Sequence, residues 1–339
     1  MVPLSVLDLA TVASGSTPAQ ALRETTELAV TAERLGYRRF WVAEHHAIAA
    51  VASSAPAVLI AHLANATTTM RVGAGGVMLP NHAPLVVAEQ FATLEALHPG
   101  RIDLGIGRAP GTDHVTARAL RRSADLNATH FPDDVVELIR YLLPSESPQH
   151  PAPVPGSGYL PEVWLLGSST FSAQLAGMLG LPFSFAYHFA PALLDQAVES
   201  YRSNFEPSLL LSEPHLMIAV SVICAPSNEE ARFLAGSSAL NILQRSTGRV
   251  GLLPSPDEAA RYEYSVADRA IIDEAMASHV IGDPDAVRAE LEGLLARTGA
   301  DELMLSTRVH DFVVRERSYA LVAESWNRAS EDVGATGAS

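Results

Sequence analysis

The chain has 339 residues, 48% of them apolar and 18% charged, which predicts one large domain without a membrane span, because no apolar run approaches about 18 residues. Its formal net charge of −15 and the lack of any basic run argue against nucleic acid as a partner. A single cysteine excludes internal disulfides, and the absence of a signal-like segment favours a cytoplasmic location.

Short β-branched and aromatic runs alternate with amphipathic segments along the chain, and turn residues separate them. This rhythm is typical of βα units with parallel strands. Eight strands are expected, at residues 4–9, 38–43, 71–75, 101–106, 162–166, 183–186, 216–223 and 302–306. We therefore predict an α/β fold, a (β/α)8 TIM barrel with loop insertions, in one domain over residues 1–330 with a flexible tail at 331–339.

Helices are expected between these strands, and several have clear start signals. Pro18, Pro56, Pro84 and Pro284 stand where the first turn of a helix tolerates proline. The expected helices cover residues 18–35, 56–66, 84–97 and 170–179. A further helix is expected to end near residue 143, another to start at residue 284, and the last one to end near residue 330.

Two segments break the rhythm. Residues 144–161 contain six prolines and are expected to cross the surface without regular structure, because each proline ring removes a backbone donor. Residues 246–267 are polar and interrupted by glycine and proline, which predicts an irregular, mobile lid.

All 23 basic residues are arginine. Schiff-base aldolases, lysine-anchored pyridoxal phosphate and the P-loop each need a primary amine, so these classes are excluded.

Glu44-His45-His46 follows the second expected strand. It therefore lies at the carboxyl ends of the barrel strands, where TIM-barrel enzymes have their active sites. Successive strand residues point to opposite faces, so one imidazole is expected in the pocket and a metal site made of both is disfavoured. A hydrogen-bonded structural histidine is the alternative.

Two glycine-rich segments follow the third and fourth strands. Residues 72–77 present a backbone with little side-chain bulk, which fits either a flat ligand or a tight strand exit. Residues 104–111 resemble a dinucleotide fingerprint but carry Pro110 at the third glycine position. What remains is Arg108, either a clamp for a phosphate or carboxylate, or a solvated side chain.

Gly167-Ser168-Ser169-Thr170-Phe171-Ser172 lies between the fifth strand and its helix, where backbone donors and hydroxyls suit an anion. Helix capping alone explains a serine there equally well. Because strands four and five are neighbours in a barrel, Arg108 and this turn together predict one phosphate site.

The segments described so far give the chain a resemblance to the bacterial luciferase-like flavin monooxygenases over nearly its whole length. The matching pieces are Ser5-Val6-Leu7-Asp8, Glu44-His45-His46, residues 72–82, residues 100–111, Gly167-Ser168-Ser169 and Gly282-Asp283-Pro284. The resemblance implies a TIM barrel, FMN used as FMNH2, dioxygen as co-substrate, a separate NAD(P)H:flavin reductase and a homodimer.

Carried over by position, His45 corresponds to the family histidine that assists the oxygen chemistry, and Gly75-Gly76 to a pair joined by a non-prolyl cis peptide beneath the flavin ring. The implied cofactor-binding residues are Gly75, Gly76, Gly107, Arg108, Ser168, Ser169 and Ser172. Gly107 replaces a reactive cysteine of the light-emitting subunit and Ser168 an acidic residue, which disfavours light emission but not oxygenation.

The substrate is expected to be a small organic compound, and epoxidation or hydroxylation of an aromatic polyketide in secondary metabolism is the reaction that the resemblance favours. Expected pocket residues are His82, Asp113, His188, Arg308 and His310. Three alternative functions remain: a deazaflavin (F420)-dependent dehydrogenase, a metal-dependent hydrolase, and a non-catalytic flavin-binding relative. The hydrolase is disfavoured because the sequence offers few metal ligands. The dimer is expected to form through the helices at 56–66 and 84–97.

Overall fold

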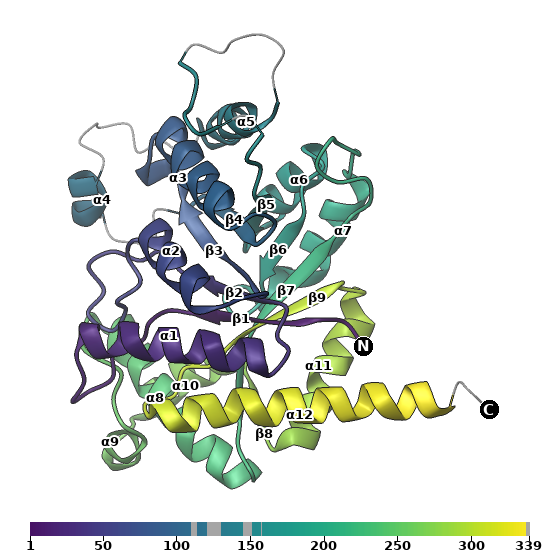
Figure 1. The fold of residues 1–339 in the computed structure, drawn as a ribbon. Coiled ribbons are helices and arrows are strands. Elements are labelled where there is room, and N and C mark those ends of the chain that lie inside the picture. The colour runs from purple at the N-terminus through teal and green to yellow at the C-terminus, as the bar shows by residue number, and fades with distance from the viewer. Residues whose placement is uncertain (110–113, 121–129, 145–150, 157, 337–339) are drawn as a thin grey trace.

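The computed structural model describes residues 1–109, 114–120, 130–144, 151–156 and 158–336 (Figure 1). Within them, eight parallel strands form a closed ring in the order β6-β5-β4-β3-β2-β1-β9-β7, and β7 pairs with β6 to close it. The barrel strands are β1 (Leu4–Asp8), β2 (Arg39–Val42), β3 (Arg71–Met78), β4 (Ile102–Gly107), β5 (Glu162–Gly167), β6 (Phe183–Ala186), β7 (Leu216–Cys224) and β9 (Glu302–Ser306). The predicted (β/α)8 TIM barrel is confirmed.

Helices pack around this barrel (Figure 1). Their bounds are α1 (Pro18–Arg34), α2 (Pro56–Ala66), α3 (Pro84–Leu97), α4 (His114–Leu120), α5 (Phe131–Leu142), α6 (Thr170–Met178), α7 (Leu194–Ser203), α8 (Asn228–Ser246), α9 (Pro256–Arg261), α10 (Val266–Met276), α11 (Pro284–Thr298) and α12 (Phe312–Thr336), with short 3-10 turns η1 (Leu79–Asn81) and η3 (Pro191–Leu193). None of these helices is both long and apolar enough to cross a bilayer.

Local signals explain most of the helix boundaries. Thr17 accepts a hydrogen bond from the backbone N–H of Gln20 and starts α1, Asp283 does the same for α11, and Gly299 ends α11 with a left-handed φ of 57°. Two elements differ from expectation. The three-residue strand β8 (Val280–Gly282) pairs with β7 outside the barrel ring, and α12 continues to Thr336 where an end near residue 330 was predicted.

A buried charge network fills the bottom of the barrel. Arg39 has no exposed surface, and it donates to Asp103 at 2.9 Å and to Glu302 at 2.8 Å. Ser5 also donates to Glu302, and the Arg39 guanidinium lies 4.8 Å from the ring centroid of Trp164. Every charge here has a partner, as burial in a low dielectric demands.

Large apolar side chains fill the middle of the barrel above this network. The rings of Trp41 and Trp164 meet edge to face at 5.4 Å, and Leu7 packs beside them. Glycines let the strands approach closely: a Cβ on Gly105 would lie 2.2 Å from the carbonyl oxygen of Ala74. Because the bottom and middle are filled, open space within the barrel is left at the carboxyl ends of the strands.

The segment 246–267 is irregular in part, as expected, but it also contains helical structure that the sequence pattern did not predict. It contains α9 and the start of α10, and capping boxes begin both helices, Ser255 with Glu258 and Ser265 with Asp268. Leu253 is fully buried and exchanges backbone hydrogen bonds with the loop after β1. The glycines and prolines break the periodicity, but the two Ser-x-x-acid patterns specify helix starts.

Candidate active site

A cavity of about 550 Å³ opens at the carboxyl ends of the barrel strands. Residues that follow or end β1, β2, β3, β6, β7 and β9 line it, together with one face of α8. The lining of the cavity contains both polar and apolar side chains, with His45, His188 and Arg308 among the polar ones and Leu7 and Ile48 among the apolar ones. In a TIM barrel this is the face at which active sites are built.

His45 reaches this cavity because it continues the inward side of β2. Trp41 and Ala43 pack inside the barrel, and His45 follows at the same alternation. Its backbone N–H donates to the carbonyl of Ser53 at 3.0 Å, and the Ser53 hydroxyl donates to the carbonyl of Ala43, which fixes the strand exit. Of the two adjacent imidazoles, His45 is the one that lines the cavity.

His46 belongs instead to a cluster around the buried carboxylate of Glu44. The Nε2 atoms of His46 and His82 both lie 2.8 Å from Glu44 Oε1, and the backbone N–H of Met78 donates to Oε2 at 3.0 Å. Burial by itself would raise the pKa of Glu44, but hydrogen bonds from both imidazoles, the charge of His82 and the Met78 N–H lower it below its ordinary value. Glu44 is therefore ionised at neutral pH.

This cluster corrects the expectation that His82 lines the pocket. His82 is held against Glu44 and is not among the residues around the cavity. Across the described part of the chain, no group of three or more histidine, cysteine, aspartate or glutamate side chains is arranged to hold a metal ion.

Gly75 and Gly76 lie within β3, and their surroundings fit both interpretations that the sequence left open. Gly75 lines the cavity and is joined to Gly76 by a cis peptide bond. A Cβ on Gly75 would lie 2.9 Å from both Leu7 Cδ1 and Trp41 Cε3, and one on Gly76 would lie 2.8 Å from the carbonyl oxygen of Gly105. Close packing thus excludes a side chain here, and a nearly bare backbone is left facing the cavity.

Arg108 and the first turn of α6 meet at the rim formed by β4 and β5. The Arg108 guanidinium lies 4.5 Å from the centroid of the Phe171 ring. Ser169 is the N-cap residue of α6, but its side chain makes no capping hydrogen bond. Arg108 makes no ion pair with any described residue. A guanidinium, a hydroxyl and a helix N-terminus in one place fit a phosphate group.

The remaining predicted cofactor residues lie around this rim. Ser168 is half-buried beside Ser169, whereas Ser172 is 2% exposed and its Oγ lies 2.6 Å from the position of a Cβ on Gly167. Gly107 ends β4 next to Met78. These residues do not line the 550 Å³ cavity, so the predicted phosphate site lies outside it.

On the far side of the cavity, Arg308 follows β9 and is held by α8. Its Nη2 donates to Asn241 Oδ1 at 2.8 Å, and the Ser238 hydroxyl donates to its backbone carbonyl at 2.6 Å. Burial and the nearby charge of Arg245 lower the pKa of Arg308 to about 10, so it stays charged at neutral pH.

Two histidines stand next to Arg308 in the same wall. His188 Nδ1 lies 2.9 Å from the carbonyl oxygen of Ala219, and burial lowers its pKa. Burial, with the charges of His188 and Arg308, lowers the pKa of His279 to about 4. Both imidazoles are therefore neutral at pH 7.

His310 is placed differently from expectation, and Asp113 lies outside the described residues. The Nε2 atom of His310 lies 3.1 Å from Oγ and 3.0 Å from the carbonyl oxygen of Ser14, which also donates to Glu258 at 2.9 Å. His310 thereby joins the loop after β9 to the loop after β1 and to α9, and it does not line the cavity.

The cavity lining includes polar residues that the sequence did not single out, among them Ser238, Asn241 and Arg245 on α8, and His279. The three on α8 carried a signal, because they are polar at spacings of three and four in a helix, which places them on one face. His279 carried none, since it precedes the unpredicted strand β8.

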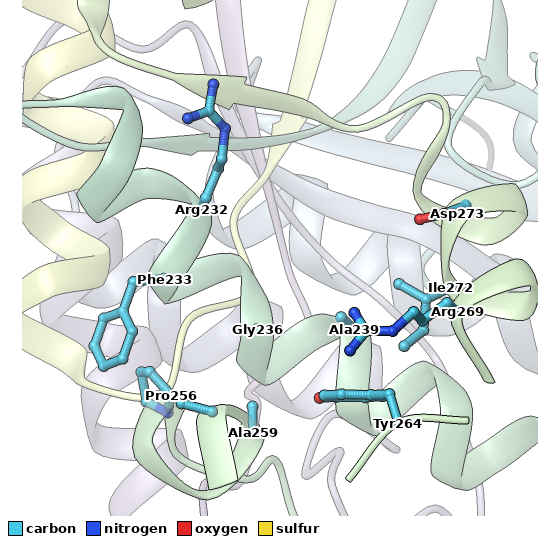
Figure 2. Close-up of a pocket in the computed structure, with 11 residues that line it drawn as sticks. Arg232, Phe233, Gly236, Ala239, Pro256, Ala259, Tyr264, Arg269, Ile272 and Asp273 are labelled. Carbon is cyan, nitrogen blue, oxygen red and sulfur yellow. The ribbon is translucent and has the colours of Figure 1, made fainter. Parts of the chain in front are cut away.

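A smaller pocket of about 280 Å³ opens on a different face of α8. Figure 2 shows its side chains coming from α8, α9, α10 and the segment between α9 and α10, among them Arg232, Phe233, Tyr264 and Arg269. No barrel strand contributes to it, so we place the candidate active site at the barrel mouth.

The chain is similar to known proteins over nearly its whole length. A family model described as luciferase-like monooxygenase matches residues 2–302. The luciferase-like monooxygenase of Escherichia coli (strain K12) is 45% identical, covering 95% of this chain and 96% of its own length. The N-acetyl-S-alkylcysteine monooxygenase of Bacillus subtilis (strain 168) is 33% identical, covering 96% and 98%. The crystal structure of apo-MsnO8 has 38% identity, a TM-score of 0.88, and coverage of 96% and 99%.

More distant solved structures share the fold while differing in cofactor. The oxygenating constituent of 3,6-diketocamphane monooxygenase from Pseudomonas putida, in complex with FMN, has 17% identity and a TM-score of 0.69. An F420-dependent secondary alcohol dehydrogenase, in complex with an F420-acetone adduct, has 15% identity and a TM-score of 0.71. At such identities the likeness shows the fold alone.

Proposed function

The chain belongs to the luciferase-like monooxygenase family, and from this premise we propose that it uses FMNH2 and dioxygen to insert one oxygen atom into a small organic substrate. The observation that carries the proposal is the mouth of the barrel, where His45 and the bare backbone of β3 face one cavity. Arg108 and the first turn of α6 form a cradle of hydrogen-bond donors at the rim of β4 and β5. Bound reduced flavin supplies the two electrons that let dioxygen divide between product and water.

In this proposal, the cradle holds the flavin phosphate. Arg108, the Ser169 hydroxyl and the first-turn N–H groups of α6 supply donors, and the Phe171 ring under the guanidinium limits its motion. The glycine backbone at Gly75 leaves room for a planar ring system between the cradle and the cavity. Anchoring by a remote phosphate is a common way to orient a reactive ring.

His45 is the proposed proton carrier. Imidazole side chains exchange protons near neutral pH, and that of His45 faces the cavity from a strand exit held by Ser53. The segment 246–267 and α8 are the proposed cover that keeps water out, because Leu253 and Glu258 fasten this segment to the loop after β1.

A thioether is one substrate candidate, because the Bacillus subtilis relative is named as an N-acetyl-S-alkylcysteine monooxygenase. Oxygen transfer to sulfur would then give a sulfoxide. The aromatic polyketide stays a prediction with no described contact in its favour. The alternative to FMN is F420, which would make the protein a dehydrogenase that transfers a hydride.

The reductase and the dimer are further parts of the proposal. A separate NAD(P)H:flavin reductase is the expected source of FMNH2. Exposed apolar side chains on α2 and α3 favour self-association: Val58 is 74% exposed and Leu97 is 65% exposed. Val58→Glu should shift the sedimentation mass to one chain, whereas Val266→Glu on α10, where the residue is 88% exposed, should leave it unchanged.

The proposed function is tested with 18O2 in a reductase-fed assay of a thioether such as N-acetyl-S-methylcysteine, with oxidised F420 and no oxygen in a parallel arm. We expect FMNH2-dependent incorporation of one 18O atom, a loss of about 100-fold or more in His45→Ala, and no loss in His62→Ala on α2. Arg108→Gln should weaken FMN binding at least about tenfold while riboflavin binding is unchanged, with Arg261→Gln as the control. Oxygen-independent oxidation by F420 alone would contradict the proposal.

A further inference from the structure

The cavity at the barrel mouth has an unusual charge balance for this chain. The chain has 38 acidic residues against 23 arginines. Yet the described residues that line the cavity include two arginines, Arg245 and Arg308, three histidines and no aspartate or glutamate. An acidic protein has therefore placed cations in this cavity without counter-ions of its own.

Other buried arginines in this chain show what a structural arginine looks like here. Arg39 contacts Asp103, Glu162 and Glu302 within 3.3 Å. Arg315 lies 3.5 Å from Asp8 and 3.8 Å from Glu24. Each compensates a buried charge with carboxylates, as the cost of burial requires.

Arg308 has no such partner. It makes no ion pair with a described residue, and its buried Nε has no hydrogen-bond acceptor. Its Nη2 is held by Asn241 at 2.8 Å, so the guanidinium is positioned by a neutral amide and keeps its full charge. An arginine held in this way beside an open cavity can bind an anion from the cavity.

The neighbours of Arg308 reinforce this polarity. Arg245 lies one helical turn after Asn241 on α8 and lines the same cavity, and its charge lowers the pKa of Arg308. His279 is neutral, and its buried Nδ1 has no partner. An anion at this wall would thus meet two cations and an available imidazole.

This wall lies across the barrel from the proposed phosphate cradle. Arg108 follows β4 and Arg308 follows β9. Around the ring, β3, β2 and β1 separate these two strands on one side, and β5, β6 and β7 on the other. The two guanidiniums therefore stand at opposite points of the mouth and serve different anionic groups.

We propose that Arg308, positioned by Asn241 and assisted by Arg245, binds the carboxylate of an organic substrate. This inference rests on the proposed monooxygenase function and adds the chemical class of the substrate. A carboxylate at Arg308 leaves the apolar part of the molecule against Leu7, Leu9 and Ile48, which line the same cavity as His45 and Gly75. The atom to be oxygenated then lies away from the charged end.

The test measures binding to the full-length protein, with and without oxidised FMN, by calorimetry. The probes are N-acetyl-S-methylcysteine and hexanoate, each paired with its methyl ester. We expect wild type to prefer each acid over its ester by at least about tenfold, and Arg308→Gln to reduce this preference to about twofold or less. Arg308→Lys should retain part of it, because charge remains while the planar fork is lost. Arg245→Gln should give a smaller loss.

Arg232→Gln is the control, since it removes one arginine charge from α8, the helix of Arg245, on the face shown in Figure 2 and away from the cavity. It should keep the full preference, and thermal melting confirms that each variant is folded. Failure of wild type to bind any acid, equal binding of acid and ester, or an unchanged preference in Arg308→Gln overturns the proposal. So does a loss of FMN over riboflavin selectivity in Arg308→Gln, which would assign the site to the flavin phosphate. The 18O2 assay reports the oxygenase activity separately, so the two failures are distinguishable.

Discussion

The Nε2 atom of His82 lies 2.8 Å from Oε1 of Glu44, and this contact joins the exit of β2 to the turn after β3. Glu44 is fully buried and also accepts from His46 and from the Met78 backbone. The carboxylate therefore fixes the two strand exits that carry His45 and Gly75.

Glu44→Gln should lower the free energy of unfolding by about 1–3 kcal/mol, because an amide cannot accept from two imidazoles and a backbone N–H at once. Urea denaturation at pH 7 measures the change. Glu27→Gln, an exposed position on α1, is the control and should be near neutral. Equal stability of the two variants would show that the cluster does not stabilise the fold.

Arg39→Met should destabilise the protein by about 3–5 kcal/mol, because it leaves Glu302 buried without its close cation and leaves Asp103 with Arg71 alone. The adjacent Arg38→Met removes the same charge from a side chain that is 48% exposed and 3.8 Å from Glu302. That change should cost less than about 1 kcal/mol. Chemical denaturation of both variants decides, and similar losses would contradict the proposed role of the buried network.

Gly105→Ala should cost about 2 kcal/mol or more, because the added Cβ would meet the carbonyl oxygen of Ala74 at 2.2 Å, and backbone cannot move aside as a side chain can. Gly293→Ala inside α11 meets nothing within 4 Å and should stabilise by about 0.5–1 kcal/mol. Melting temperatures of both variants measure the effect; a tolerated alanine at position 105 would refute tight strand contact there.

Acid should destabilise the protein through His279. Its pKa is about 4 in the folded state and about 6.5 when unfolded, so the unfolded chain binds the extra proton between these values. The stability present above pH 6.5 is lost as pH falls toward 4, by about 3 kcal/mol in all. His279→Gln should lose correspondingly less between pH 7.5 and 4.5 in denaturant titrations. An identical pH dependence of the two proteins would exclude His279 as the cause.

Local chemistry in the sequence determined most of the barrel. The bounds of α2 and α3 were predicted to the residue, because proline at the first turn and the apolar pattern act within the segment itself. The same locality explains why one of the two adjacent imidazoles was expected to face the mouth: strand alternation is a property of a few consecutive residues.

Only the tertiary structure decided which side chains work together. Arg308 and Asn241 are 67 residues apart, and Glu44 and His82 are 38 apart, so no spacing in the sequence relates them. The sequence predicted His82 and His310 as pocket residues, but in the structure they contact Glu44 and Ser14 instead. Closing the ring brings the strand exits to one mouth, and it also sets the uncompensated charge of Arg308 opposite Arg108. Burial and charge balance depend on neighbours from distant segments, and folding alone supplies those neighbours.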